Sequence, residues 1–153
     1  MDYKFELSEQ PAQATLSIRT RTKMENLPQV IGQAYHAIFE YLNEIKESPV
    51  GAPFTAYYNL DMEDLDVEMG FPVAKPLTGR DNIKPSTIPA GKQLAYLYKG
   101  SYQGMAPIYE AMAQWMQENG YTPVGTAYEF YFNSPEEVPE SELLTRIMFP
   151  LQG

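Results

Sequence analysis

The chain has 153 residues, no cysteine and a formal net charge of −9 at pH 7. This length is that of one ordinary domain, and the lack of cysteine excludes disulfides, zinc–thiolate sites and thiol catalysis. The acidic charge argues against direct nucleic-acid binding, and the lack of a signal peptide or of any apolar run long enough to span a bilayer predicts a cytoplasmic protein with no membrane partner.

The first half of the chain predicts a strand, a helix and two further strands. Residues 14–20 alternate apolar and polar side chains, as in a strand with one buried face. Between residues 30 and 45 the apolar side chains recur at helical spacing. A Pro-Val-Gly turn at 49–51 then precedes an aromatic-rich strand, and a last strand ends in Phe-Pro-Val at 71–73.

The second half predicts the same elements in the same order. A strand is expected at 93–98, and a helix follows with apolar side chains on one side between residues 105 and 116. Pro-Val-Gly recurs at 123–125, again before an aromatic strand, and the last strand ends in Phe-Pro-Leu at 149–151.

The two halves also repeat each other in sequence. Residues 49–59 read PVGAPFTAYYN, and residues 123–133 read PVGTAYEFYFN. The match extends back to the helices, where Tyr35 and Tyr109 occupy equivalent places. Such a duplication builds two copies of one unit related by a pseudo-two-fold axis.

We therefore predict an α+β fold made of duplicated strand–helix–strand–strand units, in which an antiparallel sheet carries two helices on one face. Prolines and glycines between the halves predict a linker. The expected boundaries are 1–153 for a single domain, about 1–75 and 92–153 for its half-repeats, and about 76–91 for the linker.

The copies differ most sharply where Thr55 of the first half matches Glu129 of the second. Alternate residues of a strand face opposite sides of the sheet. We assign the apolar set of each last strand, which includes Ile147, to the helix side. In the aromatic strand we likewise assign Tyr128 and Phe130 to that side, and this predicts that Glu129 lies on the opposite side. Six side chains are then expected to line one concave surface near the pseudo-axis: Tyr57, Glu68, Glu129, Tyr131, Arg146 and Met148.

A carboxylate among tyrosines suits an organic cation. The charge attracts the cation in a partly desolvated place, and each ring adds a cation–π or stacking contact of roughly 0.5–2 kcal/mol. The alternative is that Glu129 is a solvated strand residue paired with Arg146, which would neutralise such a site. The residues alone leave both interpretations open.

Four segments, taken together and in order, resemble the GyrI-like family, the effector-binding domain of multidrug-sensing transcription regulators, which also occurs as stand-alone proteins. The resemblance covers nearly the whole chain. The segments that carry it are residues 67–73 (VEMGFPV), 99–102 (KGSY), 125–135 (GTAYEFYFNSP) and 144–151 (LTRIMFPL).

The resemblance implies the duplicated fold and a pocket at the junction of the repeats. Family members bind amphipathic, often cationic aromatic molecules there, above an acidic residue that falls on Glu129 in this sequence. Tyr131 lies two residues further along the same strand, Tyr57 is its counterpart by symmetry, and Tyr102 belongs to the Gly-Ser-Tyr motif. Arg146 departs from the family pattern, which has an acidic or neutral residue there, and this is at odds with simple cation selectivity.

We predict a stand-alone small-molecule binder with Glu129 at the base of its pocket and with neither metal nor cofactor. The DNA-binding domain of the regulators is missing from these residues, so the chain would sequester a ligand or act on a protein partner. One alternative is a hydrolase of electrophilic, strained-ring molecules, with Glu129 as general base and Tyr131 or Tyr57 as donor. A second alternative is an interaction module whose acidic surface binds a basic partner such as a DNA-processing enzyme.

Overall fold

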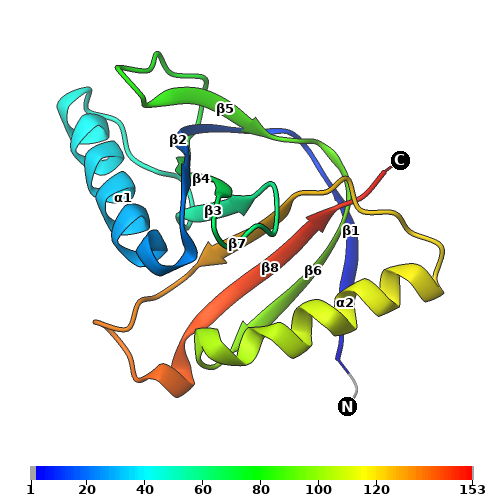
Figure 1. The fold of residues 1–153 in the computed structure, drawn as a ribbon. Coiled ribbons are helices and arrows are strands. Elements are labelled where there is room, and N and C mark those ends of the chain that lie inside the picture. The colour runs from blue at the N-terminus through cyan, green and yellow to red at the C-terminus, as the bar shows by residue number, and fades with distance from the viewer. Residues whose placement is uncertain (1–2, 153) are drawn as a thin grey trace. The chain divides into compact units, whose positions relative to one another are not determined.

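The structure, a computed structural model, describes residues 3–152 and has the α+β fold predicted from the sequence. The chain divides into two compact units, whose elements are labelled in Figure 1. Pro11–Ala90 form the first unit, and residues 3–10 and 91–152 form the second. Each unit combines antiparallel strands with one α-helix.

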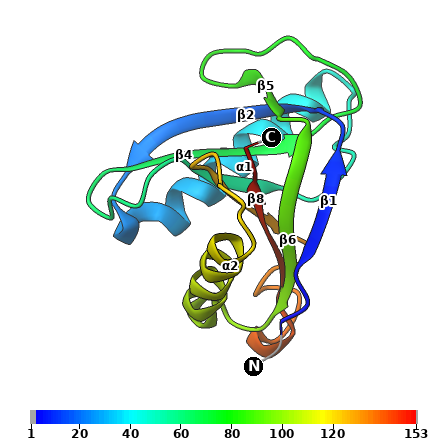
Figure 2. The ribbon, with the colours of Figure 1, turned by 90° about the vertical axis from the view of Figure 1, so that its right-hand side faces the viewer.

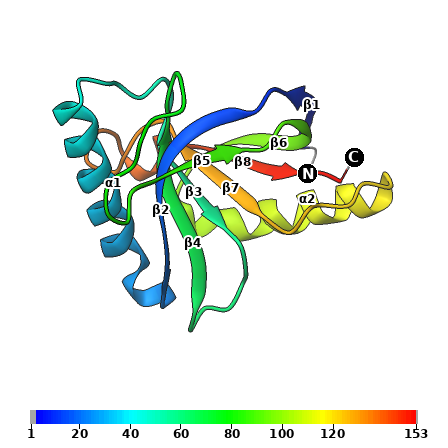
Figure 3. The same cartoon turned by 90° about the horizontal axis from the view of Figure 1, so that it is seen from above.

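The first unit has the strand order β3–β4–β2–β5, and all neighbours are antiparallel. Figure 3 shows β2 and β4 side by side at its centre. Its elements are β2 (Gln13–Thr22), the short 3-10 helix η1 (Met24–Asn26), α1 (Leu27–Glu44), β3 (Phe54–Tyr57), β4 (Leu65–Pro72) and β5 (Lys84–Ile88).

The second unit has the strand order β1–β6–β8–β7, again antiparallel throughout. Figure 2 shows its edge strand β1 running beside β6. Its elements are β1 (Glu6–Gln10), β6 (Gly91–Lys99), η2 (Tyr102–Met105), α2 (Ala106–Glu118), β7 (Ala127–Tyr131), η3 (Glu140–Glu142) and β8 (Leu144–Pro150).

The edge strands differ from the sequence expectation. The stretch 76–91, predicted to be a linker, contains β5, which pairs with β2. Pro85 lies in β5, and its missing backbone N–H is tolerated there because β5 is an edge strand. In the sequence alone, this proline was interpreted as part of a linker. Residues 6–10, expected in the first half-repeat, pair with β6 of the second unit. The unit boundaries therefore differ from 1–75 and 92–153, and the duplication itself stays an inference from the sequence.

Each helix covers one face of its own sheet with apolar side chains. In the first unit Ile38 and Leu42 of α1 are buried against strand residues such as Met69. In the second unit Met112 of α2 is buried against Ile147 and its neighbours. Both helices carry proline in the first turn, where the backbone N–H would have no partner within the helix.

No helix among residues 3–152 is long and apolar enough to cross a membrane. The cytoplasmic location expected from the sequence stays a prediction.

Candidate functional site

Strand register shows which face of the second unit carries Glu129. Residues directly opposite each other on antiparallel strands lie on the same face. Glu129 is opposite Ile147, and Tyr131 is opposite Thr145. Since Ile147 is fully buried in the core formed with α2, Glu129 and Tyr131 face α2.

The predicted face was therefore wrong for Glu129 and Tyr131. The prediction assumed that aromatic residues such as Tyr128 and Phe130 mark the helix side of the strand. Tyr128 is 4% exposed, yet it lies on the face away from α2, opposite Met148. Because β7 carries apolar rings on both faces, hydrophobicity does not identify the side that meets the helix.

Two tyrosine hydroxyls hold the Glu129 carboxyl group. Tyr131 donates from its OH to Oε1 over 2.6 Å, and Tyr109 of α2 donates from its OH to Oε2. The ring of Tyr102 in η2 meets that of Tyr131 edge-on, with 5.9 Å between centroids. We call Tyr102, Tyr109, Glu129 and Tyr131 the Glu129 cluster; Phe149 of β8 borders it through an edge contact with Tyr109 at 5.7 Å.

Burial governs the charge of this cluster. It raises the pKa of Glu129 above the ordinary 4.5, although the hydrogen bonds from Tyr109 and Tyr131 act in the opposite direction. Burial, and then the nearby Glu129 charge, raise the pKa of Tyr102. Within the part of the chain that the structure describes, no Lys, Arg or His makes an ion pair with Glu129.

The first unit has the same arrangement without the carboxylate. Thr55 is opposite Met69 on the helix-facing side of β3, and its Oγ1 lies 3.0 Å from the OH of Tyr35 in α1. Thr55 is fully buried. A helix tyrosine thus contacts the strand in both units, but it meets a hydroxyl in one and a carboxyl in the other.

Tyr57 and Glu68 both belong to the first unit, on opposite faces of its sheet. Tyr57 is opposite Val67 and packs against the core under α1, so its predicted face was also wrong. Glu68 faces away from α1, as predicted, and is 6% exposed. Its carboxyl group accepts hydrogen bonds from Ser17 and Tyr58, which gives this buried side chain local partners.

Arg146 and Met148 lie on one face of the second unit's sheet, and Glu129 lies on the other. Arg146 is opposite Phe130, and its guanidinium carbon lies 5.8 Å from the centre of that ring. Met148 is opposite Tyr128 and is 2% exposed. The possibility that Arg146 pairs with Glu129 and neutralises it is therefore wrong, because the two side chains leave β8 and β7 on opposite sides.

Of the seven predicted site residues, the structure brings Glu129, Tyr131 and Tyr102 together. Sequence reasoning missed Tyr109, which it named only as the counterpart of Tyr35 in the second helix. A signal for it was present, since Tyr35 and Tyr109 match at the same spacing as Thr55 and Glu129. A side chain that contacts one position of the repeat is expected to contact the equivalent position of the other copy.

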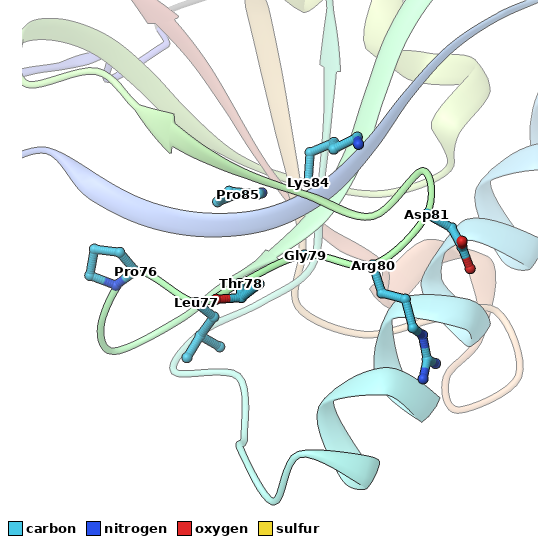
Figure 4. A pocket seen from close by; sticks show the side chains of 8 residues that line it. All are labelled: Pro76, Leu77, Thr78, Gly79, Arg80, Asp81, Lys84 and Pro85. Carbon is cyan, nitrogen blue, oxygen red and sulfur yellow. The ribbon is translucent and has the colours of Figure 1, made fainter.

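An open hollow of about 530 Å³ lies in the first unit, in the loop before and at the start of β5. Figure 4 shows its lining, from which Arg80 extends toward α1. Arg80 donates to Glu44 and its guanidinium carbon lies 4.6 Å from the centre of the Tyr41 ring. None of the predicted site residues lines this hollow, and its main cation is already paired.

A metal site is not evident in residues 3–152, where no three His, Asp or Glu side chains come together as ligands. The Glu129 cluster offers a single carboxyl group, which is too few ligands for a dedicated metal site.

The chain was compared with protein families and with solved structures. The family model described as GyrI-like small molecule binding domain matches residues 3–152. The C-terminal domain of EcmrR is 25% identical, with a TM-score of 0.79 and 99% of each chain covered. EcmrR in an EcmrR–DNA complex is 23% identical, with a TM-score of 0.85; the match covers 98% of this chain and 57% of that one, so the chain spans little more than half of that protein.

A third structure, SAV2435 bound to tetraphenylphosphonium, is 9% identical with a TM-score of 0.71, and 98% of this chain and 94% of that one are covered. At such identity the likeness shows the fold alone. No curated protein matched the sequence. Because the family model extends over nearly the whole chain, this protein belongs to the GyrI-like family of small-molecule binding domains.

Proposed function

We propose that the chain binds amphipathic aromatic cations at the Glu129 cluster. One observation carries the proposal: the partly buried Glu129 carboxyl accepts a hydrogen bond from a tyrosine at each oxygen and has no cationic partner among the described residues. Burying a carboxyl group without a counter-ion is unfavourable. A positively charged ligand would supply that counter-ion.

The chemistry of the cluster suits cations without N–H groups. Each oxygen of Glu129 already accepts a hydrogen bond from a phenol, so the carboxyl group does not depend on a donor from the ligand. A quaternary ammonium or arylphosphonium ion needs only the electric field of the carboxylate and contact with the rings. Tyr102, which is 42% exposed, gives such a ligand an aromatic contact at the solvent side.

Tetraphenylphosphonium is a suitable first probe, because SAV2435, which shares the fold, was solved with that ion bound. Isothermal titration of the wild-type protein should give a dissociation constant in the micromolar range. Tetraphenylborate has the same shape and the opposite charge, and it should not bind measurably. Equal binding of both ions would show that the site recognises rings and not charge, contrary to the proposal.

Glu129→Gln tests the role of the carboxylate. It keeps the shape of the side chain and removes the charge, and we expect the affinity for tetraphenylphosphonium to fall about tenfold or more. Glu110→Gln is the matched control, because Glu110 is exposed on α2 next to Tyr109 and its substitution changes the net charge equally. An equal loss in both variants would mean that only the overall charge matters.

The raised pKa of Glu129 supports a hydrolase as the second candidate. A carboxylate of raised pKa is a better general base at neutral pH. In that reaction Glu129 would take a proton from water while the water oxygen bonds to a strained-ring carbon. The bond between that carbon and the ring heteroatom would break, the heteroatom would take a proton from Tyr131, and the proton held by Glu129 would then return to Tyr131. Tyr57, the other donor considered, belongs to the first unit.

Turnover separates the two candidates. A strained-ring electrophile that the wild-type protein opens, and that Glu129→Gln binds without opening, would establish the hydrolase. Binding of the electrophile without a ring-opened product in the wild type would leave the binding function alone. A basic protein partner and the exclusion of nucleic acid stay predictions from charge.

A further inference from the structure

Thr145 of β8 is a fully buried residue whose hydroxyl Oγ1 has no hydrogen-bond partner among residues 3–152. It lies on the helix-facing side of the sheet, directly opposite Tyr131 of β7 and Tyr98 of β6. Glu129 is its diagonal neighbour, since Glu129 is opposite Ile147, two residues further along β8. Diagonal neighbours of this kind lie about 7–8 Å apart. Since Tyr131 belongs to the Glu129 cluster and is directly opposite Thr145, Thr145 borders that cluster.

The neighbouring hydroxyls do not donate to Thr145. Tyr131 donates to Glu129 over 2.6 Å, and Tyr98 donates to the backbone carbonyl of Ser101 over 2.8 Å. Buried polar groups are nearly always hydrogen-bonded, because the loss of water without replacement is unfavourable. An unpartnered hydroxyl next to a proposed ligand site therefore indicates a partner supplied by the ligand.

Packing alone does not require the hydroxyl at this position. In the first unit Val67 is opposite Tyr57, as Thr145 is opposite Tyr131 in the second, and Val67 is also fully buried. Valine and threonine have nearly the same shape, so an apolar side chain fills the equivalent place. Thr15 and Gln93 also lack partners in the described chain, but they lie on faces that point away from the helices.

We infer that Thr145 is a specificity-determining residue of the Glu129 site. Its hydroxyl bonds to a hydroxyl or carbonyl group of the bound cation, so the site prefers aryl cations that carry such a group over purely hydrocarbon ones. In the bound ligand the positive centre lies near Glu129 of β7, and the polar group lies near Thr145 of the neighbouring strand β8. This inference rests on the proposed cation-binding function and narrows its ligand class.

The test compares probes that differ by one hydroxyl: tetraphenylphosphonium and the 3- and 4-hydroxyphenyl derivatives of triphenylphosphonium. The wild-type protein should bind one of the hydroxylated ions about fivefold to tenfold more tightly than tetraphenylphosphonium. In Thr145→Val this preference, taken as the ratio of the two affinities measured in that variant, should fall to less than about twofold. Thr145→Ser keeps the hydroxyl and should keep the preference.

Thermal unfolding without ligand gives a second, independent readout. Because Thr145→Val removes a buried hydroxyl that has no partner, it should unfold at a higher temperature than the wild type. A lower unfolding temperature would mean that the hydroxyl is already bonded in the free protein, and would overturn the inference. So would an equal hydroxyl preference in the wild type and Thr145→Val, or no preference in the wild type.

The outcomes also separate this inference from the proposed function. If tetraphenylphosphonium binds in a Glu129-dependent way and no hydroxyl preference appears, only the role of Thr145 fails. If none of the three ions binds the wild-type protein, cation binding fails and the role of Thr145 fails with it.

Discussion

The two units of the molecule place a helix tyrosine against the same strand position but put different groups there. In the first unit Tyr35 meets the hydroxyl of Thr55, and in the second Tyr109 meets the carboxyl of Glu129. The first unit closes its core with a small neutral side chain that is fully buried. A carboxyl group is therefore not required to join helix and strand in this architecture, and its presence in the second unit has to be explained by something other than folding.

Thr55→Glu tests this difference between the units most directly, because it gives the first unit the residue of the second. Thr55 is fully buried, so the new carboxyl group would lose its water and would be too large for its place. We expect the free energy of unfolding to fall by about 2–3 kcal/mol, measured by urea denaturation at neutral pH. Thr55→Val, which only removes the contact with Tyr35, should cost about 1 kcal/mol. Full stability of Thr55→Glu would contradict the view that only the second unit accommodates a carboxyl group at this strand position.

A second pair of variants, Tyr109→Phe and Tyr35→Phe, removes the phenol hydroxyl from the helix of each unit. Tyr109→Phe deletes one donor that favours the charged form of Glu129, so the pKa of that carboxyl rises further and the affinity for tetraphenylphosphonium at neutral pH falls about threefold to tenfold. Tyr35→Phe should leave that affinity unchanged, because its partner is a neutral hydroxyl. Calorimetric titration of both variants would detect the difference, and an equal effect in the two units would argue against a special role for Tyr109.

The smallest expected effect is the pH dependence that Glu129 gives to the second unit. Since folding raises the pKa of this carboxyl, the folded state holds its proton more tightly than the unfolded state does. The resulting stabilisation is fully present below the ordinary value of 4.5 and is lost as pH rises through the raised value. In Glu129→Gln the free energy of unfolding should therefore fall less with rising pH than in the wild type, as measured by denaturation curves recorded between pH 4.5 and neutrality.

Ligand binding should change with pH in the opposite sense. A cation prefers the carboxylate, so its affinity should rise with pH until Glu129 has lost its proton, with Tyr102, Tyr109 and Tyr131 as the facing titratable groups. An affinity that is flat over this range in the wild type would show that Glu129 is already charged at the lowest pH tested.

The order of elements was predictable from the sequence, and the direction of Glu129 was not. Apolar periodicity located both helices, because each helix buries one clear stripe against its sheet. Strand β7 buries Tyr128 on one side and holds Glu129 and Tyr131 against α2 on the other, so its alternation defines two sets of residues without assigning either to a face. Only the pairing of Glu129 with Ile147 decides the question.

The edge strands were not predictable for a different reason. Strand β5 carries Pro85 and follows a loop with several turn-forming residues, which is the composition of a linker. Such a strand forms because β2 offers it an open edge, and that information lies elsewhere in the chain. The partner of β1 is likewise distant in sequence, since Glu6 pairs with Ala95.

The pairing of β1 with β6 has a consequence for how this molecule can be divided. Gln10, the last residue of β1, is the register partner of Gly91, the first residue of β6. The chain therefore leaves the second unit and returns to it at adjacent points, and Pro11–Ala90 is inserted between two neighbouring strands. A tight turn from Gln10 to Gly91 would convert β1 and β6 into a hairpin and release the Glu129-bearing half as a miniature protein with a continuous chain.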